Sequence, residues 1–404
     1  MADSIGQKIK VFLENPLYKK GSLFPFLFPI LLTLSLIIHL ISLNRRNKSY
    51  KKITDIKSVP DYNFDNLKLI CIGNILIGGT GKSPVVQKIA KTYLDKGFIV
   101  AIAARGIGKN IKSIYCNNTD PVKNLDFLSD ENREHFELLN KHSENKGIFY
   151  ILQNKKRIES LQFLLNEIKN KNYHNLKAIL ILDDGLQHFS CPRDVNICLW
   201  SPELLLESPY YAMPMGPYRE GFGKNSFQRL LNCFDFRLWS RTKENDKEEY
   251  KSKIKLSLKR FNLEPNKKDI IAVYRTNYFN IKFIENKIKL ENFKLESELN
   301  HFFTSSNSVT IITGIANPKN LISDLSSLIN KKNVITLFLN DHGELNHSAI
   351  QLIKNSTIMI MTLKDIFRWA SHPIFIDLIK EKNIIGCSVD VHFETLDNIK
   401  TEVF

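Results

Sequence analysis

The pattern of apolar and polar positions predicts a parallel β-sheet covered by helices in the first half of the chain. Residues 67–72 form an apolar run, residues 83–94 carry apolar positions at helical spacing, and residues 98–103 form a second apolar run after Gly97. Such runs predict buried strands, and the order strand, helix, strand predicts a βαβ unit. The alternation then continues, which predicts an α/β fold. The further elements that we expect are strands at 147–152, 178–182 and 195–199 and a helix at 158–168.

A second α/β series is expected near the C-terminus. Two short alternating segments, 279–284 and 288–293, predict a hairpin that precedes it. Residues 241–268 are instead rich in Lys, Glu, Asp and Asn, which is typical of a linker or a solvated surface insertion. The expected elements of the second series are strands at 309–313, 334–337 and 358–362 and helices at 318–328 and 347–354.

Residues 23–43 form an apolar run without a charged residue unless His39 is protonated. About 20 such residues suffice for a helix to cross a bilayer. A cleaved signal peptide fits poorly, because the run starts late, lacks a small-residue cleavage site and is followed by basic residues that suit anionic headgroups. We therefore expect an uncleaved anchor that either spans the membrane or lies in one leaflet. A helix buried against the folded body is the alternative.

The composition is that of a folded, basic protein. Its 404 residues are 43% hydrophobic and 25% charged, which excludes wholesale disorder and a multi-span membrane protein. The net charge of +15 suits nucleic acid, an anionic membrane surface or a phosphorylated substrate, and equally a solvated surface rich in Lys. The six cysteines lack CxxC spacing, so we expect buried thiols in the reducing cytoplasm rather than disulfides or a zinc site.

The segment Gly78-Gly79-Thr80-Gly81-Lys82-Ser83 lies between an expected strand and an expected helix. In a phosphate-binding loop (P-loop), glycines let backbone N–H groups surround phosphate oxygens, the Lys binds the β- and γ-phosphates, and the hydroxyl joins the Mg²⁺ shell. The strict pattern requires a glycine five residues before Gly81, where this chain has Leu76. The motif is therefore a variant P-loop, and a Gly-rich turn without a ligand is the alternative.

Two carboxylates, Asp183 and Asp184, follow the apolar run 178–182. Carboxylates at the C-terminal end of a parallel strand can reach Mg²⁺ held by a P-loop. We therefore expect both to be metal ligands together with Ser83, and Asp183 to be catalytic. A pair of Asp residues that merely caps a turn is the alternative.

These motifs together resemble one family, the tetraacyldisaccharide 4′-kinases, which are the lipid A 4′-kinases of Gram-negative bacteria. The resemblance implies transfer of the ATP γ-phosphate to the 4′-hydroxyl of a tetraacyl glucosamine disaccharide 1-phosphate, with Mg²⁺, at the cytoplasmic face of the inner membrane. Besides the apolar run, the matching blocks are GN-x₃-GGTGKSP at 73–84, RGxG at 105–108, DDGLQH at 183–188, Arg193-Asp194, GPYRE at 216–220, GIANP at 314–318 and Asp341-His342.

The resemblance also implies roles for single residues. Asp130 matches a catalytic Asp that pairs with a His of the second domain, here His342, and the pair is taken to deprotonate the acceptor hydroxyl. Lys82 is expected to offset charge on the transferred phosphoryl group. Arg157 could equally belong to a solvated helix face. The weaker matches, placed near the nucleotide or the lipid headgroup, are Arg157, Gln187, His188, Arg219 and Glu220.

The chain departs from the family pattern in its second domain. Leu363 stands where the family usually has Glu, and the residues after His342 lack the common second His. Neither departure removes the P-loop Lys or the acidic pair.

The expected architecture is an N-terminal membrane helix, a P-loop NTPase-like parallel-sheet domain and a smaller α/β domain joined by a short β-hairpin linker. The anchor and its basic flank cover 1–52, the kinase domain 53–240, the charged insertion and β linker 241–300, and the second domain 301–404. The expected partners are the lipid A precursor and the inner-membrane surface, with no nucleic acid. A membrane-tethered regulatory P-loop NTPase without a lipid acceptor is the alternative, and a non-enzymatic basic module has only the charge in its favour.

Overall fold

The structure is a computed structural model of a mixed α/β protein. Its strands join in one 13-stranded sheet, in the order β11-β10-β12-β13-β8-β7-β6-β1-β5-β2-β4-β3, with β9 paired to β8. All described pairs are parallel except β13 with β8, β3 with β4, and β8 with β9. The described residues are 24–53, 66–77, 80–106, 113–119, 125–143, 147–173, 175–284, 287–293, 298–299, 308–314, 318–325, 333–339, 347–370 and 372–396.

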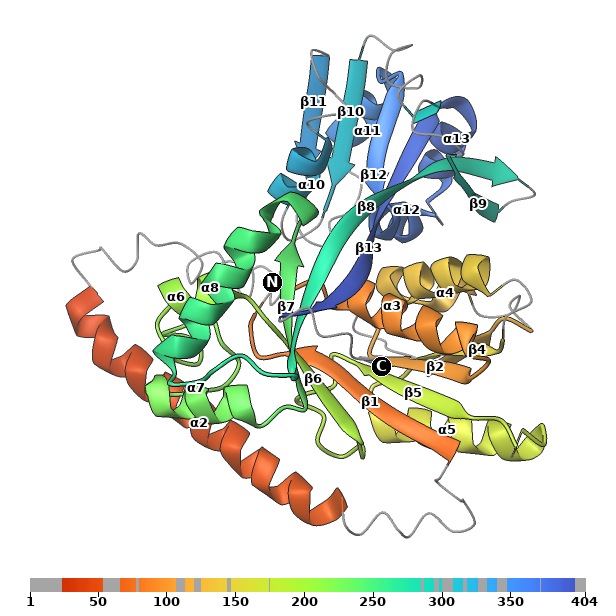
Figure 1. The fold of residues 1–404 in the computed structure, drawn as a ribbon. Helices are drawn as coiled ribbons and strands as arrows, with labels where there is room; N and C mark the ends of the chain where they lie inside the picture. Colours follow the sequence, from red (N-terminus) through yellow and green to blue (C-terminus); the bar gives the residue numbers. More distant parts are fainter. Residues whose placement is uncertain are drawn as a thin grey trace.

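The larger of two lobes contains the first α/β series (Figure 1). Helices cover both faces of its sheet, because α3 packs on the side of Ile70 and Ile181, and α5 packs on the side of Leu180. Its strands are β1 (Leu67–Asn74), β2 (Ile99–Ala104), β3 (Ile114–Asn117), β4 (Phe149–Gln153), β5 (Ala178–Asp183), β6 (Val195–Trp200) and β7 (Phe236–Thr242). Its helices are α3 (Lys82–Asp95), η4 (Leu125–Phe127), α4 (Asp130–His142), α5 (Arg157–Asn170), α6 (Pro202–Glu207), α7 (Gly223–Asn232), η5 (Glu244–Asp246) and α8 (Lys247–Arg260).

The second lobe carries the C-terminal series. Two long antiparallel strands, β8 (Asp269–Ile284) and β13 (Asn383–Thr395), run from one lobe to the other, as Figure 1 shows. One sheet is therefore continuous through both lobes, and the division into separate domains stays a prediction. The other elements are β9 (Lys287–Asn292), β10 (Ser308–Thr313), α10 (Pro318–Leu325), β11 (Asn333–Phe338), α11 (His347–Lys354), β12 (Ile358–Thr362), α12 (Leu363–Trp369) and α13 (Pro373–Glu381).

The charged segment 241–268 differs from its expected form. Residues 247–260 form α8, so the interpretation as a linker is wrong for them. Tyr250, Ile254 and Leu258 recur every fourth residue and are buried in the core of the larger lobe. Four-residue spacing places side chains on one helix face, so the charged residues are left on the other. The expected hairpin is confirmed, because β9 pairs antiparallel with β8.

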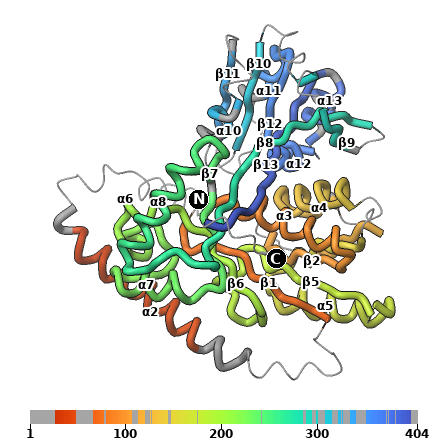
Figure 2. Tube along the Cα trace, viewed as in Figure 1, coloured from red at the N-terminus to blue at the C-terminus, as the bar shows by residue number. Residues whose placement is uncertain are grey.

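Helix α2 (Phe24–Ile53) contains the N-terminal apolar run and lies along the outside of the larger lobe (Figures 1 and 2). By length and composition alone, its segment Leu27–Asn47 could cross a membrane, with a mean hydropathy of 2.0. Only 6% of that segment is buried, so the alternative of a buried helix is wrong. Its exposed large apolar side chains are Phe28, Ile30, Leu34, Leu36, Ile37, Leu40, Ile41 and Leu43.

The cysteines are free thiols in the structure, as expected. Cys233 differs from the other five because it is exposed. Burial raises the pKa of Cys71 to about 11 and that of Cys191 to about 12, which keeps both thiols protonated and unreactive.

Candidate active site

The P-loop motif connects β1 to α3. Gly78 and Gly79 lie outside the described residues, whereas the loop from Thr80 onward is described. Gly81 has a φ of 80°, and a Cβ atom there would lie 2.6 Å from the hydroxyl of Tyr274. That hydroxyl donates to the Gly81 carbonyl at 3.0 Å. A glycine is therefore required at this position both by backbone conformation and by space.

Asn74 at the end of β1 orders the loop. It is fully buried, and its Nδ2 donates to Thr80 Oγ1 at 2.6 Å. Its Oδ1 accepts a hydrogen bond of 3.3 Å from Lys82 Nζ. One amide thus fixes two residues of the motif, although the sequence identified Asn74 only as part of a matching block.

Asp184 faces the P-loop lysine. The residue has a φ of 49°, a left-handed conformation that Asp tolerates better than most side chains. Its carboxylate lies 3.5 Å from Lys82 Nζ and accepts from Arg219 Nη1 at 3.0 and 3.1 Å. Arg219 also donates to Gln187 Oε1 at 2.8 Å, and Gln187 Nε2 donates to the Asn74 carbonyl at 3.1 Å. Four predicted residues therefore meet in one network.

Asp183 is the last residue of β5 and contacts His135, a histidine that was not predicted from the sequence. His135 is fully buried, and its ring nitrogens contact Asp183 Oδ2 at 3.3 Å and Gln87 Nε2 at 3.2 Å. Burial opposes a charge on both groups, but their mutual hydrogen bond and attraction prevail. The pKa of His135 is therefore raised and the pKa of Asp183 lowered, with Lys82 adding to the second shift.

Helix α4 supplies His135 and a second missed residue, Glu131. Ser129 caps the helix by accepting the Asn132 N–H at 3.4 Å. Glu131 accepts a hydrogen bond from the Ser83 hydroxyl. The signal in the sequence was the four-residue spacing of Glu131 and His135, which places both on the helix face toward α3.

Asp130 contacts the other lobe. Its Oδ2 accepts two hydrogen bonds from Arg368, of 3.0 Å from Nε and 2.8 Å from Nη2. Arg368 also donates to the buried Asp365 at 2.8 Å. The expected partner His342 lies outside the described residues, so its pairing with Asp130 stays a prediction.

Arg157 and His188 lie near the acidic pair and near each other. Arg157 is 1% exposed and donates to the carbonyls of Asn154 at 2.9 Å and Asp183 at 2.8 Å, so the solvated-face alternative is wrong. Burial, with the cations Arg157 and Arg105 nearby, lowers the pKa of His188 to about 4. His188 is therefore neutral at physiological pH, which suits it to exchange hydrogen bonds rather than to bind phosphate as a cation.

Glu220 is separate from this network. Its Oε2 accepts from Arg46 of α2 at 2.7 Å. Its side chain thus contacts α2, and among the described residues no hydrogen bond joins it to the acidic pair.

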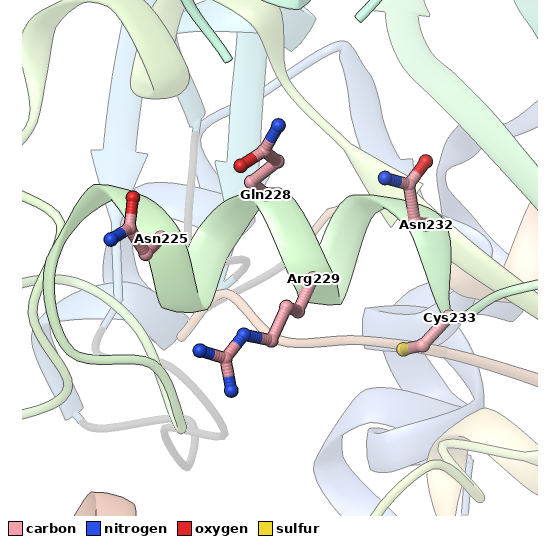
Figure 3. Close-up of a pocket in the computed structure, with 5 residues that line it drawn as sticks. All are labelled: Asn225, Gln228, Arg229, Asn232 and Cys233. Atoms are coloured by element: carbon pink, nitrogen blue, oxygen red, sulfur yellow. The ribbon is translucent and has the colours of Figure 1, made fainter. Parts of the chain in front are cut away.

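Two other features of the described residues do not involve the predicted site. Glu244, His392 and Glu394 lie close enough to ligate a metal, but Lys247 Nζ donates to both glutamates at 2.7 and 2.8 Å. A pocket of about 560 Å³ lies on α7. Figure 3 shows its lining residues, which are Asn225, Gln228, Arg229, Asn232 and Cys233.

Comparison with curated proteins finds several relatives named tetraacyldisaccharide 4′-kinase. The chain is 30% identical to one from Verminephrobacter eiseniae over 38% of this chain and 32% of the relative. It is 29% identical to one from Francisella philomiragia over 52% and 57%, and 27% identical to one from Idiomarina loihiensis over 70% and 79%. The chain thus spans from a third to little more than half of the first two relatives.

A family profile covers far more of the chain than these pairwise alignments. The profile described as tetraacyldisaccharide-1-P 4′-kinase matches residues 27–402, which include most of α2, the P-loop motif, the acidic pair and the second lobe. The chain therefore belongs to the tetraacyldisaccharide-1-P 4′-kinase family.

Proposed function

We propose that the protein is an ATP-dependent lipid kinase that phosphorylates the 4′-hydroxyl of a tetraacyl glucosamine disaccharide 1-phosphate in lipid A biosynthesis. The observation that carries the proposal is the cluster at the start of α3, where Lys82 and Ser83 join a network with Asp183, Asp184 and Glu131. P-loop phosphotransferases use a lysine, a hydroxyl and carboxylates at the end of a parallel strand. The names of the relatives supply the acceptor.

The donor set suits Mg²⁺. Ser83, Asp183 and Asp184 offer only oxygen atoms, which this cation prefers, and the lowered pKa of Asp183 keeps its carboxylate ionised. These three residues would hold the ion, which when bound would offset negative charge on the phosphates. Glu131, which accepts a hydrogen bond from Ser83, is a third carboxylate beside this set.

The chain's own residues then account for binding and proton transfer. The P-loop motif, residues 78–83, is assigned to phosphate binding, and Lys82 neutralises charge on the γ-phosphoryl group. The acceptor oxygen bonds to the γ-phosphorus while the bond to the ADP oxygen breaks. Asp130, supported by His342, takes the hydroxyl proton.

The weaker positions fall into three roles under this proposal. Arg219 and Gln187 support Asp184 beside the nucleotide. We assign His188, which is neutral because its pKa is lowered, to the sugar headgroup. Arg157 and Glu220 act indirectly, because Arg157 holds the backbone of Asp183 and Glu220 binds Arg46 of α2.

Helix α2 is proposed to bind one leaflet at the cytoplasmic face of the inner membrane. Ser35, His39 and Arg46 contact the folded body from the middle of the apolar run to its basic flank. A helix attached lengthwise to a water-exposed body cannot cross the bilayer without drawing that body into it. Its exposed apolar side chains suit the acyl boundary, where a tetraacylated substrate also resides.

The regulatory NTPase gains no support from its one matching sequence. Asn266-Lys267-Lys268-Asp269 fits the Asn-Lys-x-Asp pattern that specifies guanine in GTPases. Asp269, however, is fully buried and accepts from Arg237 at 2.7 and 2.6 Å and from Trp239 Nε1 at 2.9 Å. Its carboxylate is committed to the core, so it is not available to a base.

The experiment is to incubate the purified protein with ATP, Mg²⁺ and detergent-dispersed disaccharide 1-phosphate, and to analyse the lipid by mass spectrometry. A 4′-phosphorylated product is expected. Absence of product, or ATP hydrolysis that is unaffected by the lipid, would refute the proposal.

A further inference from the structure

One stripe of α2 is attached to the loop that ends in Arg219 and Glu220. Ser35 is fully buried; its Oγ donates to the Ala212 carbonyl at 2.8 Å and accepts the Met215 N–H at 3.1 Å. His39 Nδ1 accepts the Gly221 N–H at 3.3 Å. Both side chains thus hold the backbone on either side of the GPYRE block.

The third contact of the stripe is an ion pair between Arg46 and Glu220. Glu220 is 4% exposed, and its Oε1 has no hydrogen-bond partner among the described residues. Arg46 donates to the other oxygen at 2.7 Å and lies 5.5 and 5.7 Å from the ring centres of Phe189 and Phe234. Because a buried carboxylate needs a partner, Glu220 depends on Arg46 to keep its position.

Glu220 adjoins Arg219 in the sequence, but Glu220 contacts α2 whereas Arg219 contacts the candidate active site. The Arg219 N–H donates to the Ile75 carbonyl at 2.6 Å, which ties the loop to the end of β1. The Arg219 guanidinium donates to Asp184 and Gln187 in the candidate active site. A displacement of the Glu220 backbone would therefore act on the neighbouring residue, whose guanidinium contacts Asp184.

We propose that Arg46 is a positioning residue for the active site: through Glu220 it holds Arg219 against Asp184, so the docked anchor helix completes the phosphoryl-transfer geometry. The role of the helix then extends beyond bringing the protein to a membrane. The activity part of this proposal rests on the proposed function, whereas the coupling between α2 and the loop does not.

The test compares Arg46→Ala with Arg46→Lys and with Arg45→Ala. Arg45 is the matched control, because it is an exposed neighbour with the same charge on the same helix. Three quantities are measured: hydrogen exchange of residues 216–221, co-sedimentation with vesicles of phosphatidylethanolamine and phosphatidylglycerol, and kcat and KM for the detergent-dispersed lipid.

Arg46→Ala is expected to speed exchange in residues 216–221 about tenfold and to lower kcat about tenfold to 100-fold. Arg46→Lys should recover part of both, and Arg45→Ala should change neither. Vesicle binding should fall by the same factor, about fivefold or less, in Arg46→Ala and Arg45→Ala, because each removes one cation from the basic flank, and it should not change in Arg46→Lys. In an Arg219→Ala background, Arg46→Ala should add less than about a twofold loss, because coupled residues are not additive.

Three results would overturn the proposal: unchanged kcat in Arg46→Ala, a loss of kcat that follows the loss of vesicle binding equally in Arg46→Ala and Arg45→Ala, or full additivity with Arg219→Ala. If Arg46→Ala does not fold, Arg46→Lys and Glu220→Gln provide the same comparison. An inactive wild-type protein would refute the proposed function instead, while the exchange measurement would still decide whether Arg46 holds the loop.

Discussion

The two ends of the candidate active site are built differently. At the end that is proposed to bind the nucleotide, Lys82 contacts both Asn74 and Asp184, and all three belong to the larger lobe. At the end that is proposed to bind the acceptor, Asp130 of the larger lobe is held by Arg368 of the second lobe. These described contacts of the nucleotide end therefore lie within one lobe, whereas the acceptor end depends on how the two lobes are positioned.

Helix α4 belongs to both ends. Its Glu131 and His135 contact Ser83 and Asp183 of the nucleotide end. Further along, Leu138 packs into the core of the second lobe, and Lys141 Nζ donates to the Leu290 carbonyl at 2.7 Å. A displacement of the second lobe could therefore reach the nucleotide end through this helix, as well as through Tyr274 of β8, which contacts Gly81.

The largest effect is expected from Lys82→Ala at the nucleotide end. Loss of the ammonium removes charge compensation for the transferred phosphoryl group, so kcat/KM should fall by about 10³ or more. Steady-state kinetics with saturating acceptor would measure it. Lys88→Ala, on the same helix, is the control and should stay near wild type. Wild-type turnover in Lys82→Ala would refute the assignment of Lys82 and its network to the nucleotide end.

Asp130→Asn should affect the acceptor end alone. Loss of the base is expected to lower kcat by about 10² to 10³. The affinity for ATP, measured by calorimetry, should change by less than about threefold, because the network of Lys82 and Asp184 stays intact. Glu137→Gln on the same helix is the control. An equal loss of ATP affinity and kcat would show that the two ends are not separate.

Arg368→Ala sharpens the comparison by removing the contribution of the second lobe. Misplacement of Asp130 is expected to lower kcat about tenfold without changing the KM for ATP. Arg368→Lys should restore part of the loss, and Lys380→Ala, an exposed position in the same lobe, should change nothing. Full activity in Arg368→Ala would mean that Asp130 is positioned from its own lobe.

The smallest effect concerns stability where the lobes meet. Burial raises the pKa of Glu134 on α4 to about 7. The folded state therefore retains this proton better than the unfolded state does, and the stability that the group contributes is complete below its unfolded pKa of about 4.5 and is lost as the pH rises through about 7.

Glu134→Gln should consequently raise the free energy of unfolding at pH 8 by about 1–2 kcal/mol and leave it unchanged near pH 4. Urea titrations at both pH values would measure the difference. Glu159→Gln is the control, since hydrogen bonds lower the pKa of Glu159 and its effect should have the opposite sign. A gain that does not depend on pH would exclude the protonation of Glu134 as its cause.

Much of the fold followed from the pattern, because the strands of the parallel sheet are buried on both faces. The expected strand at 178–182 is β5, and the expected helix at 347–354 is α11 without any change of bounds. Helices α4 and α8 were not predicted from the sequence, since polar residues dominate their composition and their apolar positions are few. The length of β8 and β13 was not predicted either, because these two strands pair with each other although they are far apart in the sequence.

The sequence by itself determined the P-loop motif, the acidic pair and the apolar helix, because each is a run of neighbouring residues whose chemistry is local. Only the tertiary structure decided that Arg46 meets Glu220, 174 residues away, and that Arg368 meets Asp130, 238 residues away. Such pairs leave no periodic signal, since each partner alone resembles an ordinary surface charge. Their burial and geometry arise only when the sheet has brought the distant segments together.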